Sequence, residues 1–168
     1  LTDKVNLDSD IIFLCLGHGH SKSFLEKHQF SEQTKIVDLS NDFRLQNDAT
    51  SLRKSFTYGL VEFQKEKIKQ SNYIANPGCF ATAIQLALLP LAKAKLLNNE
   101  VHVNAITGAT GAGKQTSSTS HFSWRNNNIS TYKVFSHQHL GEIGETIESL
   151  QQRKAEVNFI PMRGDFTR

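Results

Sequence analysis

The chain has 168 residues, of which 38% are hydrophobic and 21% are charged, with a formal net charge of +3 at pH 7. These proportions are typical of a folded globular protein and exclude a chain that is disordered throughout. Scattered basic residues argue against a nucleic-acid partner, and without a long apolar stretch or a signal-peptide pattern we expect a cytoplasmic protein that does not enter a membrane.

The first half of the chain predicts alternating strands and helices. A continuously apolar run over 10–17 is typical of a strand buried on both faces of a parallel sheet. A loop is expected around Tyr58-Gly59. The other predicted elements are a helix over 21–27, a strand over 35–40, a helix over 62–69 and a strand over 72–76. Strand, crossover and strand indicate an α/β fold.

The second half begins with the longest helical pattern, over 79–97. Its apolar positions nearly encircle the helix, so we expect it to be largely buried, and Pro90 should kink it. The alternation over 100–107 predicts a half-buried strand. The remaining predicted elements are a strand over 129–135, an amphipathic helix over 140–154 and a strand over 157–162.

The two cysteines differ in context. Cys79 follows Asn76-Pro77-Gly78, where a strand turns into a helix, so its thiol should face the positive end of the helix dipole, which favours thiolate. Cys79 is therefore our candidate nucleophile, and a small buried hydrophobe is the alternative. Cys15 lies within an apolar strand, and we expect it to be buried and inert. The spacing of the two offers neither a disulfide framework nor a zinc site.

A cysteine nucleophile needs a base, and histidine is the usual one. His137 and His139 are the candidates, because residues two apart in an extended backbone share a face. A metal site is an alternative, but no third ligand is evident, and we predict no metal. Simple surface exposure is the other alternative.

Glycines follow the predicted strand 100–107, and glycine lets backbone N–H groups approach an anion. The run Gly108 to Lys114 fits all but the last position of a nucleotide-triphosphatase phosphate loop, since Gln115 stands where a Ser or Thr should hold magnesium. A P-loop nucleotide-binding protein is thus one alternative function. A plain tight turn is the other interpretation of the loop.

Two arginines could bind an anionic substrate. Arg44 and Asp42 follow the second predicted strand and could clamp a charged group, or form a surface ion pair. Arg163 has the same ambiguity.

Several short motifs occur in one order across nearly the whole chain. They are Val37–Leu45, Tyr58–Leu60 with Glu62, Ala75–Thr82, Thr107–Gly113, His137–His139 with Glu142-Ile143, and Pro161–Gly164. Together they resemble the N-acetyl-gamma-glutamyl-phosphate reductases, a semialdehyde dehydrogenase family related in fold to the glyceraldehyde-phosphate dehydrogenases.

The resemblance implies a homo-oligomeric enzyme of arginine biosynthesis, a dimer or a tetramer. With NADPH it would reduce an N-acetyl-glutamyl phosphate to the semialdehyde and release phosphate, through a thioester on Cys79. The implied roles are acid/base for His137, substrate contact for Arg44, Asn76 and His139, and cofactor contact for Gly108, Gly111, Ala112 and Gly113.

The resemblance also implies two domains. Residues 1–79 would be the tail of a Rossmann-type dinucleotide-binding domain, whose glycine fingerprint should precede Leu1, and residues 80–168 most of an α+β catalytic and dimerisation domain. We therefore expect a partial chain that is inactive alone. Gly17 and Gly141 replace prolines usual in the family. A noncatalytic oligomerisation module is the remaining alternative, and it would carry an unreactive Cys79.

Overall fold

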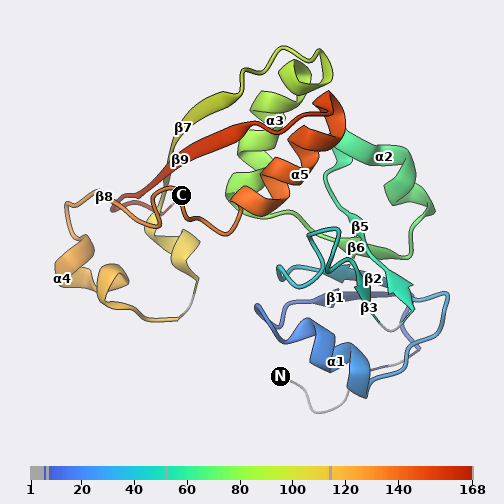
Figure 1. Cartoon of the computed structure of the whole chain (residues 1–168). Helices are drawn as coiled ribbons and strands as arrows, with labels where there is room; N and C mark the ends of the chain where they lie inside the picture. Colours follow the sequence, from blue (N-terminus) through green and yellow to red (C-terminus); the bar gives the residue numbers. More distant parts are fainter. Residues whose placement is uncertain (1–5, 7, 52, 114, 168) are drawn as a thin grey trace. The chain divides into compact units, whose positions relative to one another are not determined.

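The structure, a computed structural model, describes residues 6, 8–51, 53–113 and 115–167. The chain folds into two compact units, Leu1–Leu89 and Pro90–Arg168 (Figure 1). The domain boundary after residue 79 stays a prediction. Among the described helices, none has both the length and the apolar character needed to cross a bilayer.

The first unit is built on a parallel sheet, which confirms the α/β prediction. Its strands, in the order β1-β2-β6-β5, are Ile11–Leu14, Lys35–Asp38, Tyr73–Ala75 and Thr57–Tyr58. Every neighbouring pair is parallel, with Leu14 opposite Asp38 and Asp38 opposite Ala75. The loop expected around Tyr58-Gly59 is present but begins at Gly59, because Tyr58 ends β5. A small hairpin, β3 (Thr50–Ser51) with β4 (Lys54–Ser55), precedes it.

Two helices accompany this sheet. Helix α1 (Ser21–Lys27) has the predicted bounds, and α2 (Val61–Gln70) matches the predicted charged helix with a break in helical geometry at Gln64. The core contains an almost parallel stack of the Phe43 and Phe56 rings, whose centroids are 4.0 Å apart. The buried members of the core are Leu14, Leu25, Phe30, Ile36, Phe43, Phe56 and Ala75.

The burial predicted for β1 is wrong. Ile11 and Phe13 are 47% and 59% exposed, while Leu14 is buried, so only one face of the strand packs on the core. Ile11 and Phe13 lie two residues apart and so share the face that no described element covers. The prediction for Cys15 is wrong as well, because β1 ends at Leu14 and the Cys15 side chain is exposed.

Helix α3 (Cys79–Lys93) continues through Pro90 and ends before the predicted residue 97. It buries one stripe, which includes Phe80, Ile84 and Gln85, but Leu86 and Leu91 are exposed. The prediction that α3 is buried nearly all round is therefore wrong.

The second unit holds a sheet in the order β7-β9-β8. β7 (Glu100–Thr107) and β9 (Glu156–Arg163) pair in parallel along their full length, and alternate residues of β7 are half-buried as predicted. Helix α5 (Leu140–Gln151) lies beside β9 in Figure 1. It buries Ile143 and Ile147, and Phe159 of β9 is also fully buried.

The strand predicted over 129–135 is mostly absent. β8 contains only Ser130–Thr131, antiparallel to β9. The Tyr132 N–H still donates to the Pro161 carbonyl, but proline has no N–H to complete the pair. Lys133 and Phe135 then adopt positive φ angles of 46° and 55°, which no strand accommodates. A short helix, α4 (Phe122–Arg125), precedes β8.

Candidate functional site

Several candidate residues of the first unit follow the carboxyl ends of its parallel strands. Arg44 comes after β2, and Asn76 and Cys79 come after β6, its neighbour in the sheet. The Asn76 N–H donates to the Asp38 carbonyl at 2.8 Å, which extends the pairing of these strands to the turn before α3. Ligands of open parallel sheets bind at this edge.

Arg44 is buried and linked to that turn. Its Nε donates to the Asn76 carbonyl at 2.9 Å, and its Nη2 donates to the Leu39 carbonyl at 3.2 Å. Its burial excludes a surface location for Arg44. The contact of Arg44 with substrate stays a prediction.

Asp42 accepts hydrogen bonds from backbone N–H groups at and just before the start of α1. Its carboxylate accepts the N–H of Gly19 at 2.6 Å and the N–H of Ser21 at 2.9 Å. Asp38, fully buried, accepts the hydroxyls of Ser21 and Ser40, each at 2.6 Å. The first N–H group of α1 is thus already satisfied by a carboxylate.

Cys79 is the first residue of α3 and is exposed, whereas Pro77 and Gly78 before it are buried. The Gly78 carbonyl accepts the Thr82 N–H at 2.8 Å, so the helix ladder begins directly at this turn. The alternative that Cys79 is a buried hydrophobe is excluded. An exposed thiol at a helix N-terminus is the environment typical of reactive cysteines.

In the second unit, His137 and His139 lie together, as predicted, but not on an extended strand. His139 precedes α5 in helical geometry, and the two rings meet edge to face with centroids 4.5 Å apart. Both side chains are buried, which excludes simple surface exposure. Nε2 of His139 lies 4.0 Å from Oε1 of Glu142. Among the described residues, no cluster of three or more potential ligands is arranged to hold a metal.

The environment of His137 favours its neutral form. Burial, followed by the positive charges of His139, Lys133 and Arg163, lowers its pKa from 6.5 to about 4. Its Nδ1 accepts the His139 N–H at 3.2 Å. A neutral ring that accepts at Nδ1 carries its proton on Nε2, so His137 presents an N–H donor at neutral pH.

The glycine-rich loop folds as a 3-10 turn over Ala109–Ala112. A Cβ at Gly108 would collide with the backbone of Phe166 and Thr167, and the Ala109 N–H donates to the Phe166 carbonyl at 2.7 Å. The loop therefore packs on the chain itself, and these contacts do not bring it to the two histidines. Gly113 has a φ of 77° and open space where a Cβ would be.

The structure does not support the phosphate-loop alternative. A phosphate loop leads directly into an α-helix, whose N-terminus binds the anion. In the described residues after the loop, the next α-helix begins only at Phe122. Lys114, which the pattern requires, lies outside the described residues.

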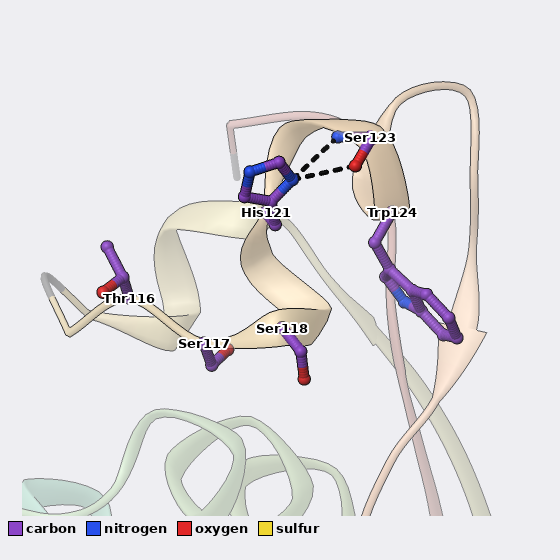
Figure 2. Close-up of a pocket in the computed structure, with 6 residues that line it drawn as sticks. All are labelled: Thr116, Ser117, Ser118, His121, Ser123 and Trp124. Carbon is purple, nitrogen blue, oxygen red and sulfur yellow. Dashed lines mark hydrogen bonds between the residues drawn. The ribbon is translucent and has the colours of Figure 1, made fainter.

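The structure has a hollow of about 630 Å³ that we did not predict (Figure 2). Its lining comes from α4 and from the segment that joins α4 to the glycine loop. Figure 2 shows the His121 ring turned toward Ser123, whose hydroxyl lies 2.8 Å from Nδ1. The lining residues are Thr116, Ser117, Ser118, His121, Ser123 and Trp124.

Models of two protein domains match the chain. The dimerisation domain of semialdehyde dehydrogenases matches residues 79–168, and their NAD binding domain matches residues 2–71. The chain is 64% identical to the N-acetyl-gamma-glutamyl-phosphate reductase of Flavobacterium johnsoniae, with 99% of the chain and 52% of that protein covered. It is 60% identical to the reductase of the same name from Christiangramia forsetii, with 99% and 51% covered. The chain spans about half the length of these curated relatives.

Solved structures share the fold. Aspartate semialdehyde dehydrogenase II from Vibrio cholerae has a TM-score of 0.64 at 16% identity, with 92% of this chain and 51% of that chain covered. The enzyme from Francisella tularensis has a TM-score of 0.60 at 14% identity, with 95% and 56% covered. The predicted combination of a Rossmann-type part and an α+β dimerisation part is confirmed. The chain belongs to the semialdehyde dehydrogenase family, within which it is similar to the N-acetyl-gamma-glutamyl-phosphate reductases.

Proposed function

We propose that the whole protein is an NADPH-dependent reductase of arginine biosynthesis, which converts N-acetyl-glutamyl 5-phosphate to N-acetylglutamate semialdehyde with release of phosphate. The observation that carries the proposal is the exposed thiol of Cys79 at the start of α3, beside the carboxyl edge of a parallel sheet. The names of the similar reductases supply the substrate.

The first chemical step belongs to Cys79. Its thiolate attacks the carbonyl carbon of the acyl phosphate, a C–S bond forms, and the bond to the phosphate oxygen breaks as phosphate leaves with the electron pair. The result is a thioester, which divides a difficult reduction into two easier steps. The thiol stands at the N-terminal end of α3, where an exposed cysteine is accessible to the substrate.

The other site roles are proposals of the same kind. His137 acts as the acid/base partner, and in its neutral form the N–H at Nε2 can donate a hydrogen bond to a substrate oxygen. His139, Arg44 and Asn76 contact substrate. For Arg44, the bonds to the Asn76 and Leu39 carbonyls fix the guanidinium at the sheet edge where the substrate would lie.

The described residues fit a nicotinamide cofactor in part. Gly17 and Gly19, after β1, have φ angles of 87° and 82° and open space where a Cβ would be, so a ring can approach the backbone there. We propose these two glycines as cofactor contacts of the first unit. Gly108, Gly111, Ala112 and Gly113 stay the proposed cofactor contacts of the second unit. When bound, NADPH supplies the hydride that reduces the thioester to the aldehyde level.

The dimerisation-domain match supports a further part of the proposal, that the protein forms a homo-oligomer. Sedimentation velocity over a range of protein concentrations measures this state. The alternative of a noncatalytic oligomerisation module predicts the same assembly, so it is separated only by the reactivity of Cys79.

The proposed chemistry is tested with acetyl phosphate, the simplest acyl phosphate, and mass spectrometry of the intact chain and its peptides. We expect an acetyl adduct on Cys79 that hydroxylamine removes, as it does a thioester. The Cys15→Ser variant should keep the adduct, and Cys79→Ser should lose it. Equal labelling of both cysteines, or none at Cys79, would contradict the proposal.

A further inference from the structure

Arg163 is a charged residue of the second unit to which the proposed reaction assigns no role. It is the last residue of β9 and lies opposite Thr107, the last residue of β7, at the carboxyl ends of two parallel strands. Its guanidinium lies over the Tyr132 ring, with Cζ 4.1 Å from the ring centroid. This stacking fixes the plane of the guanidinium and leaves its edges to form hydrogen bonds.

One N–H donor of this guanidinium has no acceptor within the described residues. In the described part of the chain, the Nε atom of Arg163 is buried and has no hydrogen-bond partner. Asp165, two residues further along the chain, accepts the Asn127 N–H at 2.8 Å, and Lys133 donates to Gln138 at 2.7 Å. A buried cationic donor without an acceptor is costly, unless a bound anion supplies the acceptor.

The neighbours of Arg163 add positive potential and further donors. Tyr132 lies between it and His137, with 5.8 Å between the centroids of the Tyr132 and His137 rings, and His137 contacts His139. After burial, the charges of His139, Lys133 and Arg163 lower the His137 pKa, while Glu142 opposes them. The charge of Arg163 therefore acts on His137, which places the two residues in one electrostatic environment.

We infer that Arg163, fixed by its stack on Tyr132, forms an oxyanion-binding site beside His137 and His139. Its fork suits a carboxylate or a phosphate, the two anionic groups of an acidic acyl phosphate. The inference rests on the proposed function and deepens it by assigning Arg163 to an anionic group of the substrate. Its test does not use Cys79, so either idea can fail without the other.

The test is an NMR titration of the histidine ring signals of the intact chain with inorganic phosphate and, separately, with glutarate. Chloride keeps the ionic strength constant. We expect saturable shifts at His137, and Arg163→Gln should weaken the binding about tenfold through loss of a charge-assisted bond. The anion that binds more tightly identifies the end of the substrate that the site takes.

Two further variants make the outcome decisive. Arg163→Lys keeps the charge but loses the planar fork, so its affinity should fall between those of wild type and Arg163→Gln. Arg53→Gln removes an exposed arginine from the first unit and should bind as wild type does. Wild-type affinity in both Arg163 variants, or shifts that chloride alone reproduces, would overturn the inference.

Discussion

At the scale of single residues, the buried His137 makes stability depend on pH. Its pKa is lowered to about 4 in the folded chain, so the unfolded chain takes up a proton near pH 6.5 and the folded chain does not. The free energy of unfolding should therefore fall as the pH decreases from 6.5 to 4, by an amount on the order of 3 kcal/mol. Urea unfolding at pH values across this window measures it.

The matched variants for this measurement are His137→Gln and His102→Gln. His137→Gln should show a clearly shallower loss of stability between pH 6.5 and 4. His102 is exposed in the same unit, and its variant should follow the wild-type curve. Identical slopes for His137→Gln and wild type would show that His137 does not resist protonation in the folded state.

The sequence predicted some features of the candidate site residues and missed others. The sequence correctly placed Cys79 at the start of a helix, and its role as nucleophile stays a prediction. The short spacing of His137 and His139 correctly placed their rings together. The sequence could not predict the bonds of Arg44 to the Asn76 and Leu39 carbonyls, because they join positions that only the parallel pairing of β2 and β6 brings together. Arg163 was ambiguous in sequence for the same reason, since its stack on Tyr132 depends on pairing in the second sheet.

At the scale of elements, Arg125 fixes the segment between β7 and β8. It is buried, and it donates to the Thr119 carbonyl at 2.9 Å, to the Ser130 hydroxyl at 3.0 Å and to the Arg163 carbonyl. Arg125→Met would leave these acceptors without their donor, so we expect a loss of about 3 kcal/mol in the free energy of unfolding of this unit.

Fluorescence of Trp124, the single tryptophan of the chain, reports the Arg125→Met effect locally. Arg53→Met removes an exposed arginine and should leave the unfolding midpoint nearly unchanged. An Arg125→Met protein as stable as the Arg53→Met protein would show that this segment is not held by Arg125.

Elements with a regular apolar pattern were predicted well, and those that depend on backbone geometry were not. Helix α1 and strand β7 have the predicted bounds because local periodicity determines them. The strand over 129–135 failed because the residues around Lys133 have strand-like side chains but a positive φ angle, and because Pro161 opposite cannot donate. The pattern of α3 was misread because helical periodicity alone does not say which apolar positions find a neighbour.

At the scale of the whole molecule, the order of the motifs carried more information than any one of them. Each motif alone had a structural alternative, and the structure gives the glycine loop a packing role at Gly108. The domain models match the two halves of the chain separately, in the order that the motifs predicted. Long-range features, such as the exposed face of β1, could not be predicted because burial depends on the surroundings of an element and not on its own sequence.

The central claim is that Cys79 is the nucleophile, and competitive alkylation of the two thiols near neutral pH tests it most directly. Both thiols are exposed, so Cys15 is a matched internal control that lacks only the helix N-terminus. We predict that iodoacetamide modifies Cys79 about tenfold faster than Cys15 in the folded chain, and that urea abolishes the difference. Equal rates in the folded chain would contradict the assignment of Cys79 and the reductase mechanism that rests on it.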